Sequence, residues 1–210
     1  TQNIIIGGLA GDALTTGANN VIIGLEALSA EDAHGKNVAI GHQALKVQDA
    51  GADAYNVAVG YQAGLDLTNG TKCVLVGNSA GENITTNVGN VAIGHEALQT
   101  ANSGEDYNIA VGYQALSGID NSASDRNIGI GQSALSGGSD IGYDNIAIGA
   151  NAMLANSAVD YCIAIGTSAL RGTMTSAADG TIVIGATAGN AITSGGGNIA
   201  IGYAAMSVHT

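Results

Sequence analysis

A nine-residue motif recurs twelve times along this 210-residue chain. It reads Asn, aliphatic, small or aliphatic, aliphatic, Gly, two variable residues, Ala, and then Leu, Met or Gly, as in NVAIGHQAL from Asn37. Successive motif glycines lie 17 to 19 residues apart, starting with 17 between Gly7 and Gly24. The period is too short for helix-pair repeats or propeller blades. The repeat therefore restricts the chain to a small set of stacked architectures.

Each repeat predicts a strand, a turn, a second short strand and a loop. The aliphatic stretch ends at the motif Gly, a second short segment surrounds the Ala, and Gly, Asn, Ser, Thr and Asp join them. Units of this size stack as coils of a parallel β-solenoid, in which each strand pairs with its counterparts one coil away. We therefore predict an all-β fold, a parallel β-solenoid or β-roll of twelve coils. It forms a single repeat domain over residues 1–210, which we interpret as an excerpt of a longer fibre protein.

The predicted strand is apolar on both faces. Its first and third aliphatic residues share one face, and the middle residue, such as Ala39, points the other way. The middle residue is never polar, so its face must pack on the far wall of the coil or on another chain. We favour another chain, because the few aliphatic side chains of one coil must offset the ordering of a whole repeat. The expectation is an oligomer whose chains share a core through the small middle residues.

Other columns of the motif have predicted structural roles. The Gly sits where the strand must turn and where positive φ is often required. The Ala three residues later indicates a column with no room for a larger side chain. Asn opens nine of the twelve coils, with Cys73, Cys162 and Thr181 in the other three, and stacked amides are expected to hydrogen-bond in a ladder. The predicted turn glycines are Gly24, Gly41, Gly60, Gly77, Gly94, Gly112, Gly131, Gly149, Gly166, Gly185 and Gly202.

Composition excludes several classes of function. With 5 Lys and Arg against 17 Asp and Glu, the net charge is -12, so neither nucleic acid nor an anionic membrane surface is an expected partner. No apolar run is long enough to span a membrane as a helix, so membrane insertion is not expected. The 46% hydrophobic content argues against disorder. These exclusions leave a folded, acidic, stacked protein.

The motif resembles repeats of two known groups of fibrous proteins. N-[VI]-A-[IV]-G-x-x-A-L is similar to the head repeats of trimeric autotransporter adhesins of the YadA type, and still more to the NTAIGYQAL repeats of phage tail fibres. The resemblance covers nearly the whole chain and implies a homotrimer of β-rolls with a role in attachment. It also implies a location outside the cell or on the virion surface.

Candidate sites for chemistry are few. Asp106, Asp125, Asp160 and Asp179 precede the strand-opening position by two residues, and would stack like charges one coil apart. Their oxygens suit Ca²⁺, so they are calcium candidates, and the alternative is solvated loop charge. No cofactor is expected.

The remaining side chains of interest are predicted to be structural. Cys73 and Cys162 lie five coils apart and are expected to be buried free thiols. His42 and His95 are three coils apart, too far for one metal ion, in a partly exposed or inter-chain column. The sequons at Asn69 and Asn83 lie in inter-repeat loops, where glycans would fit.

The sequence favours a non-enzymatic, structural function. We expect the shaft or attachment segment of a trimeric virion tail fibre, with inter-repeat loops available to a host or cell-surface receptor. The alternatives are the head domain of a bacterial trimeric surface adhesin and a subunit of a self-stacking extracellular filament. A glycosidase is disfavoured, because only the Asp pairs have suitable spacing and neither Trp nor Phe is present to stack a sugar.

Overall fold

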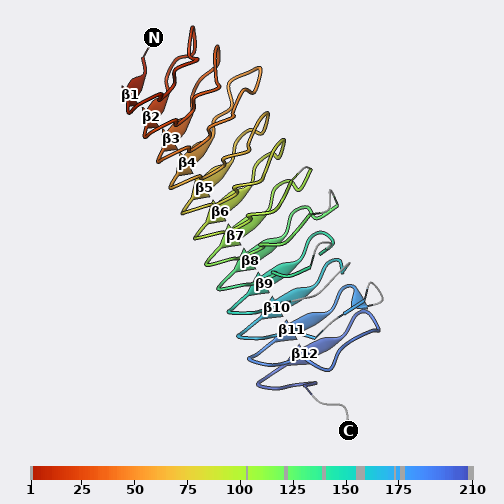
Figure 1. The fold of residues 1–210 in the computed structure, drawn as a ribbon. Coiled ribbons are helices and arrows are strands. Elements are labelled where there is room, and N and C mark those ends of the chain that lie inside the picture. Colours follow the sequence, from red (N-terminus) through yellow and green to blue (C-terminus); the bar gives the residue numbers. More distant parts are fainter. Residues whose placement is uncertain are drawn as a thin grey trace.

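The chain winds into a β-solenoid of twelve coils (Figure 1). The computed structural model describes residues 2–102, 104–120, 123–138, 141–154, 159–172, 174–175 and 178–207. Each coil contributes one three-residue strand. The strands are β1 (Ile4–Ile6), β2 (Val21–Ile23), β3 (Val38–Ile40), β4 (Val57–Val59), β5 (Val74–Val76), β6 (Val91–Ile93), β7 (Ile109–Val111), β8 (Ile128–Ile130), β9 (Ile146–Ile148), β10 (Ile163–Ile165), β11 (Ile182–Ile184) and β12 (Ile199–Ile201). Within the described ranges, no helix is long and apolar enough to cross a membrane.

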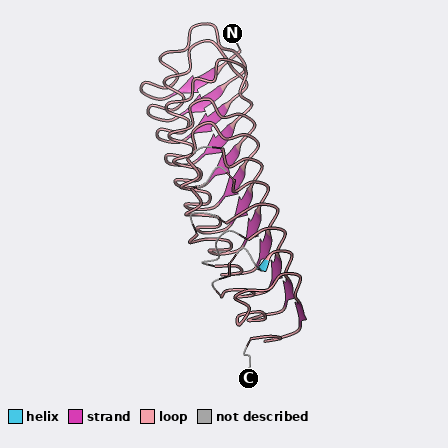
Figure 2. Cartoon of the chain, turned by 90° about the vertical axis from the view of Figure 1, so that its right-hand side faces the viewer, coloured by secondary structure: helices cyan, strands magenta, loops and turns pink. Residues whose placement is uncertain are grey.

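The strands form one parallel sheet in sequence order, which confirms the predicted solenoid. Each strand pairs with the next in perfect column register, so that Ala39 of β3 lies opposite Ala58 of β4. Figure 2 shows the sheet along one side of the solenoid, with turns and loops completing each coil. Because every connection is one coil long, the repeat period alone sets which residues are neighbours.

The face of the sheet that points into the coil is the opposite of the one that we expected. From β2 to β12 the middle residue of each strand is buried inside the coil, and Ala39 and Ala147 are 0% exposed. The first and third residues face outward and are partly or clearly exposed. The prediction that the middle alanines pack between chains is therefore wrong. The coil is narrow, so the small side chain belongs inside, opposite leucines from the turn.

The second segment of each repeat is a turn rather than the predicted short strand. In the second coil, Glu26 and Leu28 have φ of 55° and 45°, on either side of the buried Ala27. The same left-handed conformation recurs at these motif positions in other coils, at non-Gly residues. Coil-to-coil hydrogen bonds hold it, as when Leu28 N donates to the Ala44 oxygen at 2.9 Å. The turn directs the ninth motif residue into the core.

The size of the middle strand residue and the size of the ninth motif residue compensate each other across the narrow core. Most coils pair a small middle residue with a large ninth motif residue, as with Ala110 and Leu116, both 0% exposed. The fifth coil reverses this, with Leu75 in the strand and Gly81 in the turn. A Cβ on Gly81 would lie 2.8 Å from a Leu75 methyl carbon. Gly therefore stands at the last motif position where a large strand residue of the same coil or the next takes the space, as Leu75 also does beside Gly64.

Candidate functional site

The most extensive surface feature is the outer face of the sheet, which we call the aliphatic face. It consists of the first and third residues of strands β1–β12, all Val or Ile. Ile93, Ile148 and Ile184 are 40%, 37% and 37% exposed, although each is flanked by equivalent residues one coil away. The aliphatic face is thus a contiguous apolar stripe along one side of the solenoid. Apolar stripes of this kind mark interaction surfaces in soluble proteins.

An aromatic column borders the aliphatic face. It begins directly after the motif Gly, where His42 stacks on Tyr61 with ring centroids 5.2 Å apart and His95 stacks on Tyr113 at 5.4 Å. Tyr61 and Tyr113 are about half exposed. The prediction of a partly exposed column is confirmed, and each His has an aromatic neighbour in the next coil. The column therefore carries stacked, polar-tipped rings in these two pairs of coils, whereas Asn78 and Gln132 occupy it elsewhere.

The motif glycines hold the coils at their closest approach. Their φ values run from 126° to 146°, which confirms the predicted positive φ. A Cβ on Gly94 would lie 2.4 Å from the Gly112 oxygen, and the other internal motif glycines are equally confined. No L-residue side chain fits such a position. The motif Gly is therefore required both by its backbone conformation and by its neighbour.

The strand-opening asparagines form a buried ladder. Most of its hydrogen bonds join a side-chain amide to the backbone of the next coil rather than to another side-chain amide. The Asn145 backbone N–H donates to Asn127 Oδ1 at 3.0 Å, and Asn127 Nδ2 donates to the Gly142 carbonyl at 2.9 Å. The same two bonds recur in other coils, as at Asn108. Each amide therefore ties the strand of the next coil to that coil's loop.

The two cysteines are buried free thiols, as predicted. Cys73 replaces Asn within the ladder, and its Sγ donates to the Asn87 carbonyl at 3.4 Å. Burial raises the pKa of the Cys73 thiol to about 11, although N–H groups from Asn90 and Gly89 act in the opposite direction. Burial likewise raises the pKa of Cys162. These thiols are neutral packing and hydrogen-bonding groups rather than nucleophiles.

The four calcium candidates form two pairs in consecutive coils, and each carboxylate has a backbone partner. Asp125 Oδ1 accepts from the Asp106 N–H at 2.8 Å, and Asp179 Oδ1 accepts from the Asp160 N–H at 3.0 Å. Asp106 and Asp160 accept in turn from the preceding coil, through the N–H groups of Val88 and Tyr143. These bonds are a structural reason for Asp at this position, and calcium binding there stays a prediction.

Arg126 lies beside one of these pairs, but its main partner is another carboxylate. Its Nε is 2.8 Å from Asp144 Oδ1, its Nη2 is 3.1 Å from Asp144 Oδ2, and Asp125 Oδ2 is 3.8 Å from Nη1. The guanidinium also lies over the Tyr143 ring at 5.7 Å. Hydrogen bonding to Asp144 raises the pKa of Arg126. This exposed pair joins neighbouring loops on the surface.

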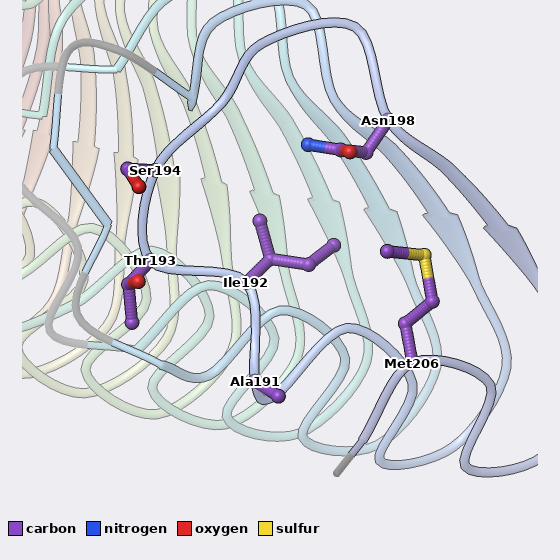
Figure 3. A pocket seen from close by; sticks show the side chains of 6 residues that line it. All are labelled: Ala191, Ile192, Thr193, Ser194, Asn198 and Met206. Carbon is purple, nitrogen blue, oxygen red and sulfur yellow. The ribbon is translucent and has the colours of Figure 1, made fainter. Parts of the chain in front are cut away.

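Two pockets lie over the core at opposite ends of the solenoid. One, of about 370 Å³, is lined by residues of the last two coils. Figure 3 shows the side chains of Ile192, Asn198 and Met206 converging on it. The other, of about 300 Å³, lies at the first coil beside Ile5 and Leu14. Both lie at core positions that the adjacent coil fills elsewhere in the solenoid.

Sequence reasoning missed one cluster of ionisable side chains. Glu31, Asp32, His34 and Asp49 bring one potential metal-ligand atom each to within 4.8 Å of one another. Their only sequence signal is the appearance of Glu31 in a motif column that is otherwise mostly apolar.

In comparisons with known proteins, no protein family, no curated protein and no solved structure matches the chain.

Proposed function

We propose that this chain is a structural shaft or attachment segment of a trimeric fibre, without catalysis. The observation that carries the proposal is the aliphatic face, which runs over all twelve strands and is partly exposed. Packing this face between three copies would remove it from water, and the hydrophobic gain grows with every coil added. The resemblance of the repeat to tail-fibre and adhesin-head repeats agrees with this use.

The proposed role is mechanical. Coil-to-coil backbone bonds, the Asn ladder and the buried core make each coil a template for the next, while inter-repeat loops face away from the sheet. We place the assembly on the virion surface or outside the cell, with loops available to a host or cell-surface receptor. The alternative within this class is the head domain of a bacterial surface adhesin.

The oligomeric state tests the proposal. Sedimentation equilibrium of the purified chain is expected to give a particle of three 20.5 kDa chains. Ile93→Lys places a charge on the aliphatic face and is expected to weaken association about 100-fold or more, because the charge would be buried without a partner. Thr86→Lys, at an exposed loop position of the preceding coil, is the matched control and is expected to leave the trimer intact. A stably folded monomer at all concentrations, or equal effects of the two variants, would contradict the proposal.

A filament that grows end to end is the second candidate. Its basis is that, within the described residues, β1 and β12 each pair along one edge, next to the two end pockets. Unpaired strand edges are templates for further strands. Electron microscopy of the purified chain separates the two candidates, because a shaft segment gives short rods of uniform length and a stacking subunit gives open-ended fibrils.

A further inference from the structure

The loop after β2 contains a carboxylate, that of Glu31, at a position where other coils place a core residue. Glu31 stands seven residues after its motif Gly, and this column holds the core residues Leu67 and Ile84 in the fourth and fifth coils. The Glu31 side chain is 0% exposed. A buried carboxylate at a core position requires compensation by hydrogen bonds or positive charge.

The compensation within the chain is incomplete. Glu31 Oε1 accepts from the His34 backbone N–H at 2.9 Å and lies 3.3 Å from His34 Nδ1, but no group of the described residues forms a hydrogen bond with Oε2. Two related positions show how the fold normally satisfies such a group. Gln48, in the same column one coil later, bonds through both its amide atoms, and the buried Glu105 accepts from Asn87 Nδ2 through Oε2.

Three more ligand groups converge on Glu31. His34 follows in the same loop, and Asp32 and Asp49 occupy one column in consecutive coils. One ligand atom from each of the four residues lies within 4.8 Å of the others. No Lys or Arg in the described part of the chain forms an ion pair with these carboxylates, since Lys36 pairs with Asp53 and Lys46 with Glu26. In the part of the chain that the structure describes, three carboxylates thus meet around one imidazole without a Lys or Arg partner.

We propose that Glu31, Asp32, His34 and Asp49 bind a divalent transition-metal ion, preferentially Zn²⁺. One imidazole nitrogen with three carboxylate oxygens supplies the four N and O ligands that Zn²⁺ accepts, whereas Ca²⁺ requires six to eight oxygens. The ligand atoms must approach to about 3.4 Å of one another in a tetrahedral zinc site. Asp32 and Asp49 are exposed at the loop surface and have the freedom to close this gap.

The ion would join consecutive coils. Backbone bonds already fix both halves of the site, since the Asp32 carbonyl accepts from Thr15 N–H and the Asp49 N–H donates to the Thr68 carbonyl. The ion would add a link between the second and third coils that does not pass through the sheet. This inference is independent of the proposed fibre function, because it rests on the loops alone.

Isothermal titration of the chelator-treated chain with ZnCl₂ and, separately, CaCl₂ tests the site. One Zn²⁺ per chain is expected, and His34→Gln is expected to lower the zinc affinity at least about tenfold. His95→Gln, at an exposed His that lies 3.6 Å from the carboxylate of Glu96, is the matched control and is expected to bind Zn²⁺ like the parent chain. Asp49→Asn, at an exposed position, gives a second ligand removal that leaves the core untouched.

Cobalt substitution provides an independent readout. Co²⁺ in the parent chain is expected to give the visible absorption of a four-coordinate ion, and this band is expected to be lost in His34→Gln and kept in His95→Gln. The proposal is overturned by zinc binding that is absent, that is equal in the two His variants, or that is weaker than calcium binding.

Discussion

At the residue scale, the most constrained position of the repeat is the motif glycine. Its φ near 130–140° is closed to other residues, and the carbonyl of the next coil occupies the place of a Cβ. Gly51 also has positive φ, at 66°, but a Cβ there would meet nothing within 4 Å. A substitution at Gly51 therefore tests backbone strain alone, whereas a substitution at Gly94 tests backbone strain together with a collision between coils.

Gly94→Ala is expected to destabilise the fold by about 3 kcal/mol or more, because strain and collision act together. Gly51→Ala is expected to cost about 1 kcal/mol, because only the left-handed backbone opposes it. Urea denaturation of the two variants measures the difference. Equal losses of stability would show that the collision with the Gly112 carbonyl is relieved without cost.

The Cys73 thiol makes stability depend on alkaline pH. Its pKa rises from 9.0 to about 11 on folding, so the folded state favours the neutral thiol. The stabilisation from Cys73 is fully present below about pH 9, and it is lost as the pH rises to about 11, by an amount on the order of 2 kcal/mol.

Cys73→Asn isolates this effect, since it restores the common ladder residue and removes the titrating group. Between pH 8 and pH 11, the parent chain is expected to lose more unfolding free energy than the variant in urea denaturation. Cys162 is present in both proteins and cancels. Parallel pH profiles of the two proteins would refute the assignment.

At the element scale, each coil is a short strand whose stability depends on the turn across the core. Leu75 and Gly81 exchange volume within the fifth coil, whereas the seventh coil uses Ala110 and Leu116 beside Ile119. The fifth coil already has Ile84 at the position of Ile119. Two substitutions therefore convert one pattern into the other.

Leu75→Ala alone is expected to cost about 2–5 kcal/mol through the cavity that it leaves. Gly81→Leu alone is expected to destabilise as well, because the new side chain collides with Leu75. The double variant is expected to be more stable than either single variant, as measured by a double-mutant cycle in urea. Additive losses would show that the two positions do not share space.

The repeat period was sufficient to predict the solenoid, the aliphatic strand of each coil and the role of the motif Gly, because in-register stacking follows directly from a constant spacing. It was not sufficient to decide which strand face points inward. Val38 and Ile40 are as apolar as Ala39, so hydrophobicity does not distinguish the faces, and only the width of the coil does. The metal-ligand cluster was missed because its members come from two loops whose contact depends on loop conformation.

At the scale of the whole molecule, each coil contacts mainly its two neighbours, so the number of coils is free to change. Deletion of residues 90–107 removes one whole coil and joins Gly89 to Asn108, which then takes the place of its equivalent Asn90. The shortened chain is expected to fold, with a sheet shorter by about 4.8 Å. Deletion of residues 90–98, half a coil, is expected to prevent native stacking from that point. Far-UV circular dichroism and thermal unfolding compare the two, and equal behaviour would contradict coil-by-coil stacking.

The parallel arrangement of β1–β12 also gives the solenoid a direction, as the subunits of a cytoskeletal polymer give it two unlike ends. A ring of three such rods with cyclic symmetry must point all of them the same way. Their three β1 strands then lie together at one end and their three β12 strands at the other. In the proposed trimer, any group fused beyond either strand would be presented in three copies at one known end, and the aliphatic face would set both the number and the orientation of those copies.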